Sequence, residues 1–141
     1  MRFMMLMIPK GYETAAPGTM PEADRVAEMM KFNEDLQKAG ALIALDGLHP
    51  LSMGARVTFE NGNALVTDGP HIETKEVLGG YWIIDVPSKA AAVEWASRCP
   101  ASPNEMIEIR QMMEFDDFPP EVQEAAAGFE AMLTDSPNTR S

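Results

Sequence analysis

The stretch that most constrains the fold is residues 2–8, because it is apolar on both faces if it forms a strand. Alternate side chains of a strand point to opposite faces of its sheet. One face would carry Phe3, Met5 and Met7, and the other Met4, Leu6 and Ile8. Residues 81–84 repeat the pattern. A strand of this kind is typical of the centre of a sheet that is covered from both sides.

The order of the expected elements defines a frame. Strands are expected at residues 2–8, 41–50, 56–60, 63–67, 77–86 and 106–115, and helices at residues 19–39 and 88–98. Asn61-Gly62 is a strong signal for a two-residue turn, so we expect residues 56–67 to form an inserted β-hairpin. Without this hairpin, the elements follow the order βαββαβ, which is the ferredoxin-like α+β arrangement.

Local signals set the boundaries of these elements. Thr19 and Ser88 are the expected N-caps of the two helices, because their hydroxyls can accept a free backbone N–H. Gly79-Gly80, near the start of the strand at 77–86, predicts a bulge or the close approach of another backbone.

Two helices cover only one face of such a sheet, so the second face needs another cover. A second copy of the sheet, related by a two-fold axis, supplies it most economically. We therefore expect a homodimer with its sheets packed face to face, a dimeric α/β barrel. The methionines within residues 3–7 and 111–113 suit this interface, because their flexible side chains fill irregular gaps. A thioether copper site is the sharper but less favoured interpretation, since core packing already explains these residues.

A chain of 141 residues is most simply one domain. We expect this domain over residues 1–118, a helical extension over residues 119–133 and a disordered tail over residues 134–141. The net charge of −11 disfavours direct contact with nucleic acid or an anionic membrane.

Cys99 is the only cysteine, which excludes an intrachain disulfide and a cysteine-based zinc cluster and predicts a buried free thiol. The apolar start is too short for a signal peptide and is followed by Pro9-Lys10-Gly11. No apolar run approaches the roughly 18 residues of a membrane span. We expect a soluble cytoplasmic protein.

His49 and Asp68 are the first candidate pair for chemistry. Each lies at the end of an expected strand, and this frame can bring such ends together. A carboxylate beside an imidazole fixes its tautomer and raises its basicity, the minimum for a general base. In the structural alternative, Asp68 accepts backbone N–H bonds in its own turn and His49 is a surface loop residue. Asp46 is most simply a turn residue, with a reserve role as partner of His49.

Further candidates for ligand binding are His71, Glu73, Lys75, Tyr81 and Arg110. Lys75 stands between two acids, which is typical of solvated or mutually paired charges; over a barrel mouth it would meet an anionic group. The histidines and carboxylates of this region match no compact metal motif, so no metal and no cofactor are expected.

One motif resembles a known family. Thr67-Asp68-Gly69-Pro70, Glu73-Thr74-Lys75-Glu76 and Leu78-Gly79-Gly80-Tyr81 are similar to the signature of the YCII-related family, and more narrowly of its DGPF-domain branch. The resemblance extends over roughly residues 1–115. His71 stands where the signature has phenylalanine, a departure that places a titratable ring at the turn.

The resemblance implies a dimeric α+β barrel whose function is poorly defined in most members. It also implies a candidate active site at a His–Asp pair in the cavity between the sheets. It implies a bacterial setting often linked to extracytoplasmic-function sigma factors. At least one related enzyme type removes chloride from a chlorinated hydroxyquinol.

Two function classes therefore stay open. The first is a non-catalytic module that binds a small molecule or a protein partner between or beside its sheets, in bacterial regulation. The alternative is a cofactor-free isomerase or lyase acting on a cyclic or phenolic substrate, with His49 as base and Asp68 orienting it.

Overall fold

A computed structural model describes residues 1–134 and contains a four-stranded antiparallel sheet with the strand order β2-β5-β1-β6. The four strands are β1 (Arg2–Ile8), β2 (Leu42–Gly47), β5 (Gly80–Asp85) and β6 (Met106–Gln111). β1 and β5 are the two inner strands, as their apolar patterns predict. The order matches a βαββαβ frame and is compatible with a ferredoxin-like α+β fold.

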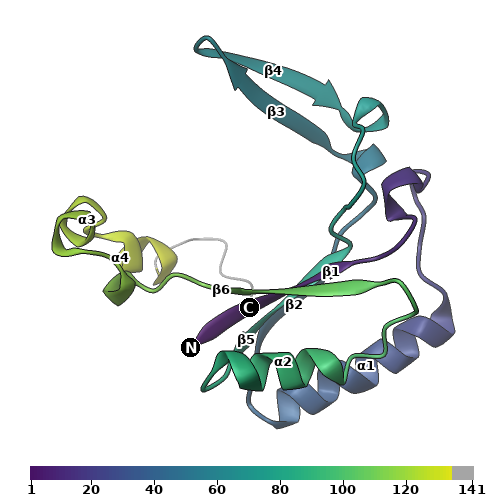
Figure 1. The fold of residues 1–141 in the computed structure, drawn as a ribbon, viewed down its shortest axis with the longest axis horizontal. Helices are drawn as coiled ribbons and strands as arrows, with labels where there is room; N and C mark the ends of the chain where they lie inside the picture. Colours follow the sequence, from purple (N-terminus) through teal and green to yellow (C-terminus); the bar gives the residue numbers. More distant parts are fainter. Residues whose placement is uncertain (135–141) are drawn as a thin grey trace.

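Two helices, α1 (Ala23–Lys38) and α2 (Lys89–Ser97), lie on the same side of the sheet, below it in Figure 1. The predicted cap of α2 is confirmed, because Ser88 Oγ accepts the N–H of Ala91 at 3.1 Å. The predicted cap of α1 is wrong. The Thr19 hydroxyl instead donates to the Ala16 carbonyl at 2.6 Å, and the helix begins after the extended residue Glu22. Pro21 disfavours helical geometry in the residue before it, which delays the start.

The core lies between these helices and the sheet. Its buried side chains come from β1 (Phe3, Met5, Met7), β5 (Trp82, Ile84), α1 (Phe32, Leu36) and α2 (Ala92). Phe32 and Trp82 meet edge to face, with ring centroids 5.7 Å apart. Trp82 Nε1 donates to Asn33 Oδ1 at 2.8 Å, the polar tie between the helix and the sheet inside this core. Since a buried indole N–H needs an acceptor, this bond fixes the rotation of α1 against β5.

Among residues 1–134, no helix covers the opposite face of the sheet, which we call the open face (Figure 1). Its side chains from β1 and β5 are Met4, Leu6, Ile8, Tyr81 and Ile83, all half-buried. They alternate with the fully buried side chains of the same strands. The two-sided apolar pattern of the sequence is therefore real, but within one chain only one side is fully covered.

A β-hairpin projects from the end of the sheet (Figure 1). It consists of β3 (Ala55–Glu60) and β4 (Asn63–Asp68), which within residues 1–134 pair only with each other. Asn61 and Gly62 have φ angles of 51° and 80°, which confirms the expected two-residue turn. Val57, Phe59 and Val66 are more than half exposed. An isolated two-stranded sheet with exposed apolar side chains is marginal by itself.

Two short 3₁₀ helices hold the base of the hairpin: η2 (Leu51–Met53) and η3 (Gly69–His71). Gly69 N–H donates to the Gly54 carbonyl at 2.9 Å. A Cβ atom on Gly69 would lie 2.2 Å from the Leu51 carbonyl oxygen. The glycine of the Asp-Gly-Pro turn is therefore required by backbone packing.

The strand expected at residues 77–86 is shorter than predicted, because β5 begins only at Gly80. Gly79 instead bridges two neighbours: its N–H donates to Met7 O at 2.8 Å and its carbonyl accepts Leu48 N–H at 2.9 Å. A Cβ atom on Gly79 would lie 2.6 Å from Pro9 Cγ. A Cβ atom on Gly80 would lie 2.9 Å from the Asp46 carbonyl oxygen, so the predicted close approach of another backbone is confirmed at Gly80.

The chain leaves β6 through a 3₁₀ helix, η4 (Phe115–Asp117), and Arg2 anchors this exit with bonds of 2.7 and 3.0 Å to Glu114. The extension is helical, as expected. It contains two helices, α3 (Pro120–Ala125) and α4 (Phe129–Thr134), and Gly128 between them has a φ of +91°. The expected disordered tail lies, apart from Thr134, outside the described residues.

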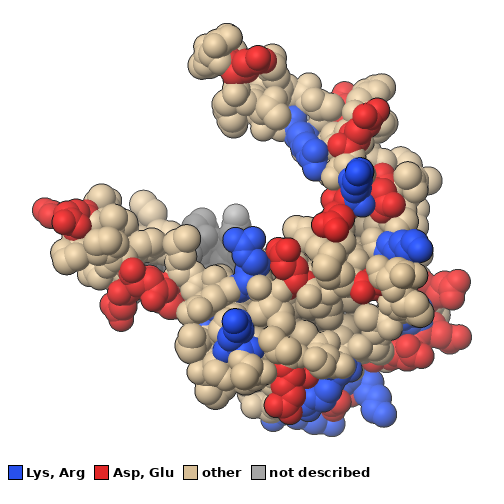
Figure 2. Space-filling model, in the orientation of Figure 1, with Lys and Arg blue, Asp and Glu red and all other residues tan. Residues whose placement is uncertain are grey.

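The hairpin and the extension flank a hollow above the open face in Figure 2. The hairpin shows few charged side chains there, apart from those at its tip and base (Figure 2). Within residues 1–134, no helix combines the length and the apolar character that crossing a membrane requires.

Gly69→Ala should lower the free energy of unfolding by about 2 kcal/mol or more, since the new methyl group meets fixed backbone atoms. Thermal unfolding followed by circular dichroism measures the change. Gly47→Ala is the matched control, because a Cβ there meets no heavy atom within 4 Å. Equal melting temperatures for the two variants would contradict the packing role of Gly69.

Candidate functional site

A cavity of about 640 Å³ lies between the first half of α1 and the sheet. We call it the α1 cavity. On the sheet side it is bordered by the end of β1 at Met7, the end of β2 at Leu45 to Gly47, and the start of β5 at Gly80 to Trp82. Antiparallel pairing brings these three strand ends to one place, since both Met7 and Gly47 are paired with Gly80.

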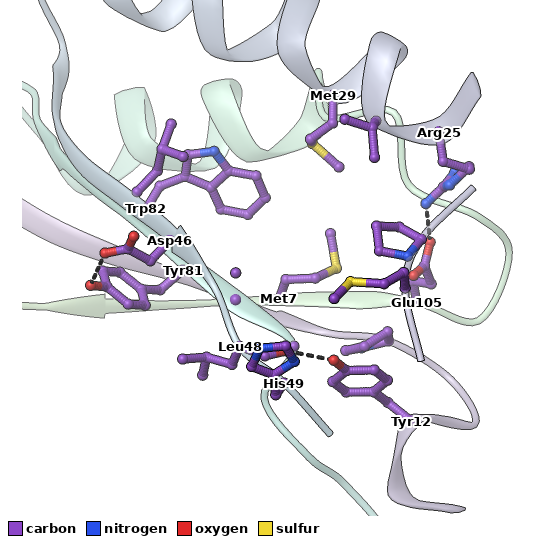
Figure 3. A pocket seen from close by; sticks show the side chains of 18 of the residues that line it. Met7, Tyr12, Arg25, Met29, Asp46, Leu48, His49, Tyr81, Trp82 and Glu105 are labelled. Atoms are coloured by element: carbon purple, nitrogen blue, oxygen red, sulfur yellow. Dashed lines mark hydrogen bonds and ion pairs between the residues drawn. The ribbon is translucent and has the colours of Figure 1, made fainter. Parts of the chain in front are cut away.

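The cavity exists because only the second half of α1 packs closely on the core. In the first half, Arg25 reaches sideways and donates to Pro100 O at 3.1 Å and to Glu105 Oε1 at 2.8 Å. The same oxygen of Glu105 also accepts the Ser102 N–H at 2.6 Å. This network holds the start of the helix to the loop before β6. Figure 3 shows Arg25 and Met29 on the helix, with Met7 and Trp82 across the space.

Most of the cavity wall is apolar. The apolar side chains are Met7, Met20, Val26, Met29, Met30, Leu45, Leu48 and Trp82. Four of them, Met20, Val26, Met30 and Leu48, are between 41% and 66% exposed and form the rim. A concave, mainly apolar wall with a few polar groups is the usual character of a small-molecule site.

Tyr12, in the 3₁₀ helix η1 (Tyr12–Thr14), closes one side of the rim. Its hydroxyl donates to the Leu48 carbonyl, next to His49 (Figure 3). Burial raises the pKa of the Tyr12 hydroxyl above its ordinary value. Tyr12 therefore stays protonated at neutral pH and acts as a hydrogen-bond donor that positions the 48–49 segment.

His49 lies at the rim and is exposed. It also borders a second hollow of about 470 Å³, together with Arg56 and Glu76. Asp68 is exposed at the end of β4, and its side chain accepts no capping bond from η3. Among residues 1–134, no hydrogen bond or ion pair joins His49 to Asp68. The acid–base pair stays a prediction.

The other candidates are spread over the molecule. His71 ends η3, and Glu73 and Lys75 lie between η3 and β5; all three are exposed and do not line the α1 cavity. Tyr81 borders the cavity and donates to Asp46 Oδ2 at 2.8 Å, so the reserve partner of His49 is bonded elsewhere.

Arg110 is 71% exposed on β6 and forms an ion pair with Glu108 at 3.6 Å. It does not border the α1 cavity either. No cluster of three or more His, Cys, Asp or Glu side chains suited to a metal ion occurs in the part of the chain that the structure describes.

Sequence reasoning missed Asn33, Arg25 and Glu105. Asn33 is only 8% exposed and lines the cavity next to Trp82. A signal was present, because position 33 follows Val26 and Met29 by seven and four residues and thus falls on the apolar face of the helix. A polar side chain on that face has to find a buried partner.

Cys99 lies behind the cavity wall, with its Sγ 3.8 Å from Met29 Sδ. The thiol is free, as expected, but it is half-buried rather than fully buried. Burial, and then the nearby Glu105 carboxylate, raise the pKa of the Cys99 thiol to about 11. The thiolate is therefore scarce at neutral pH.

Comparison with known proteins gives two findings. A family model described as "YCII-related domain" matches residues 1–116. An uncharacterized protein of Rhizobium meliloti (strain 1021) is 37% identical over 59 residues, which cover 42% of this chain and 48% of that protein. The alignment thus spans about half the length of the curated relative.

Native Cys99 should react with iodoacetamide roughly 100-fold more slowly than the urea-unfolded chain at about pH 8, because its pKa is about 11 against an ordinary 9.0. Since the folded pKa is raised, the rate should climb until the pH reaches that value. Mass spectrometry measures the rate without ambiguity because the chain has one cysteine. Equal rates in the folded and unfolded chain would contradict this environment.

Proposed function

The chain belongs to the YCII-related family, and we propose that it is a binding protein for a small, neutral and largely apolar molecule. The observation that carries the proposal is the α1 cavity, whose volume of about 640 Å³ lies within the range of ordinary ligand sites.

The charges at the cavity support a neutral ligand. Arg25 is paired with Glu105 at 2.8 Å, and Asp46 accepts the Tyr81 hydroxyl. Arg25 and Glu105 neutralise each other, and the Asp46 carboxylate, whose partner Tyr81 is a neutral phenol, disfavours anions. The chain as a whole carries a net charge of −11, which repels anions.

We further propose that the chain is a member of the DGPF branch and a homodimer with its open faces packed together as a dimeric barrel. The motif Thr67-Asp68-Gly69-Pro70 with Glu73 to Glu76 supports the branch. The half-buried Met4, Leu6 and Ile83 on the open face support the assembly, because such a surface gains from a second apolar cover. The inserted hairpin, with Phe59 79% exposed, gains from the same cover.

In this proposal, ligand binding serves regulation in a bacterial cell through a protein partner, in the sigma-factor setting that the resemblance implies. A second candidate function is the isomerase or lyase on a cyclic or phenolic substrate. It is favoured by the place of His49 on the cavity rim. It would need a carboxylate for this imidazole from a rearranged hairpin or from a partner chain.

A naphthalene-sized ketone, 2-acetylnaphthalene, should bind with a dissociation constant on the order of 0.1 mM. This value follows from the usual binding free energy per non-hydrogen atom of a small ligand. Binding should quench the fluorescence of Trp82, which lines the cavity. Trp95→Phe is the matched control and should keep the response, because Trp95 instead packs against Phe32 and Arg98. A response that survives Trp82→Phe and disappears with Trp95→Phe would place the probe elsewhere.

Light scattering at micromolar concentration should give twice the mass of one chain. Leu6→Glu should shift the mass to that of one chain, because it places a charge at the centre of the open face. Val93→Glu, at an exposed position of α2 on the other side of the sheet, should leave the dimer intact. A wild-type monomer would refute the face-to-face assembly.

A further inference from the structure

We propose that Asn33 makes the α1 cavity selective for ligands that carry a neutral hydrogen-bond acceptor, such as a ketone oxygen. The inference rests on the proposed binding function and adds the chemistry by which the cavity would choose its ligand. It concerns a residue that lies in the middle of α1, below the rim of the cavity.

The orientation of the Asn33 amide is fixed by its neighbour. Trp82 Nε1 lies 2.8 Å from Asn33 Oδ1. An indole N–H can only donate, so the atom facing it has to be the amide oxygen. The NH₂ group of Asn33 therefore points away from Trp82.

This NH₂ group lacks a strong acceptor. Its hydrogen-bond partner in the described residues is Met30 Sδ at 3.7 Å. A thioether is a weak acceptor, and an amide nitrogen has two hydrogens to donate. Asn33 is only 8% exposed, so water does not replace the missing acceptor freely. A buried donor in this state gains when a ligand brings an oxygen to it.

Two other polar groups of the cavity are already engaged. Arg25 donates to Glu105, and the Tyr12 hydroxyl donates to Leu48 O. Met30, which now meets the Asn33 amide, is 48% exposed and can turn outward at small cost. A ligand would place its apolar body between Trp82 and Met29 and its acceptor at Asn33.

A matched pair of probes isolates this contact. In 2-isopropylnaphthalene a methyl group replaces the carbonyl oxygen of 2-acetylnaphthalene, with almost the same shape. Equilibrium dialysis against the full chain gives the ratio of the two affinities, ketone over hydrocarbon. This ratio should be about three- to tenfold higher in the wild type than in the double variant Asn33→Leu with Trp82→Phe. The double variant removes both partners of the buried bond and so leaves no unpaired indole.

Met30→Leu is the control variant. It removes the thioether from the Asn33 amide and keeps the amide itself, so the ratio should stay as high as in the wild type or rise. A ratio that falls with Met30→Leu as far as with the double variant would overturn the role of Asn33.

A second readout does not depend on folding of the double variant. In ¹H–¹⁵N spectra of the wild type, the side-chain NH₂ signals of Asn33 should move downfield with the ketone and much less with the hydrocarbon. The outcomes separate the two proposals. If neither probe binds, the proposed function fails. If both bind, with the same ratio in every variant and no selective shift, only the inference about Asn33 fails.

Discussion

The structure depends on a sheet that is apolar on both faces but has helices on only one. β1 and β5 bury Phe3, Met5 and Trp82 against α1 and α2, and this side supplies the core of the chain. The other side leaves Met4, Leu6 and Ile83 half-buried. Burial of apolar area is the main favourable term in folding. Covering this second face would therefore stabilise the protein further. The hairpin and the extension both stand beside that face (Figure 1).

The α1 cavity follows from the way the helix is held on the covered side. The Trp82–Asn33 bond and the Phe32 contact fasten the middle of α1, while Arg25 ties its first turn to the loop at Pro100 and Glu105. Between these two fixing points the helix cannot settle onto the strand ends. The α1 cavity is the space that remains between the helix and the sheet. The polar contacts that position α1 thus also determine the shape of the cavity.

The sequence predicted the parts of the fold that depend on local rules. Asn61-Gly62 gave the hairpin turn, and Ser88 the start of α2, since each signal acts within a few residues. Predictions failed where a neighbour close in sequence or distant in space intervened. Pro21 delayed α1, and Gly79 left the strand pattern because it bridges Met7 and Leu48.

The site was harder to predict from the sequence. The charged groups around Asp68 were predicted as site residues because they are close together in the sequence. The structure instead shows a packing role for Gly69 beside them. Asn33 and Arg25 were not predicted as site residues, because their roles depend on partners far along the chain, at Trp82 and Glu105. The place of Asn33 on the apolar face of α1 indicated a buried partner, but no local pattern identifies a partner so far along the chain.

The segment 48–54 has a consequence for how distant parts of the molecule communicate. Leu48 and His49 border the α1 cavity. Leu51 and Gly54 contact Gly69 at the base of the hairpin. One short stretch is thus both a wall of the cavity and the base of the hairpin that follows it at residues 55–68. A bound molecule that displaced this stretch would therefore also shift the base of the hairpin. By linkage, a partner that held the hairpin would then change the affinity of the cavity by the same factor.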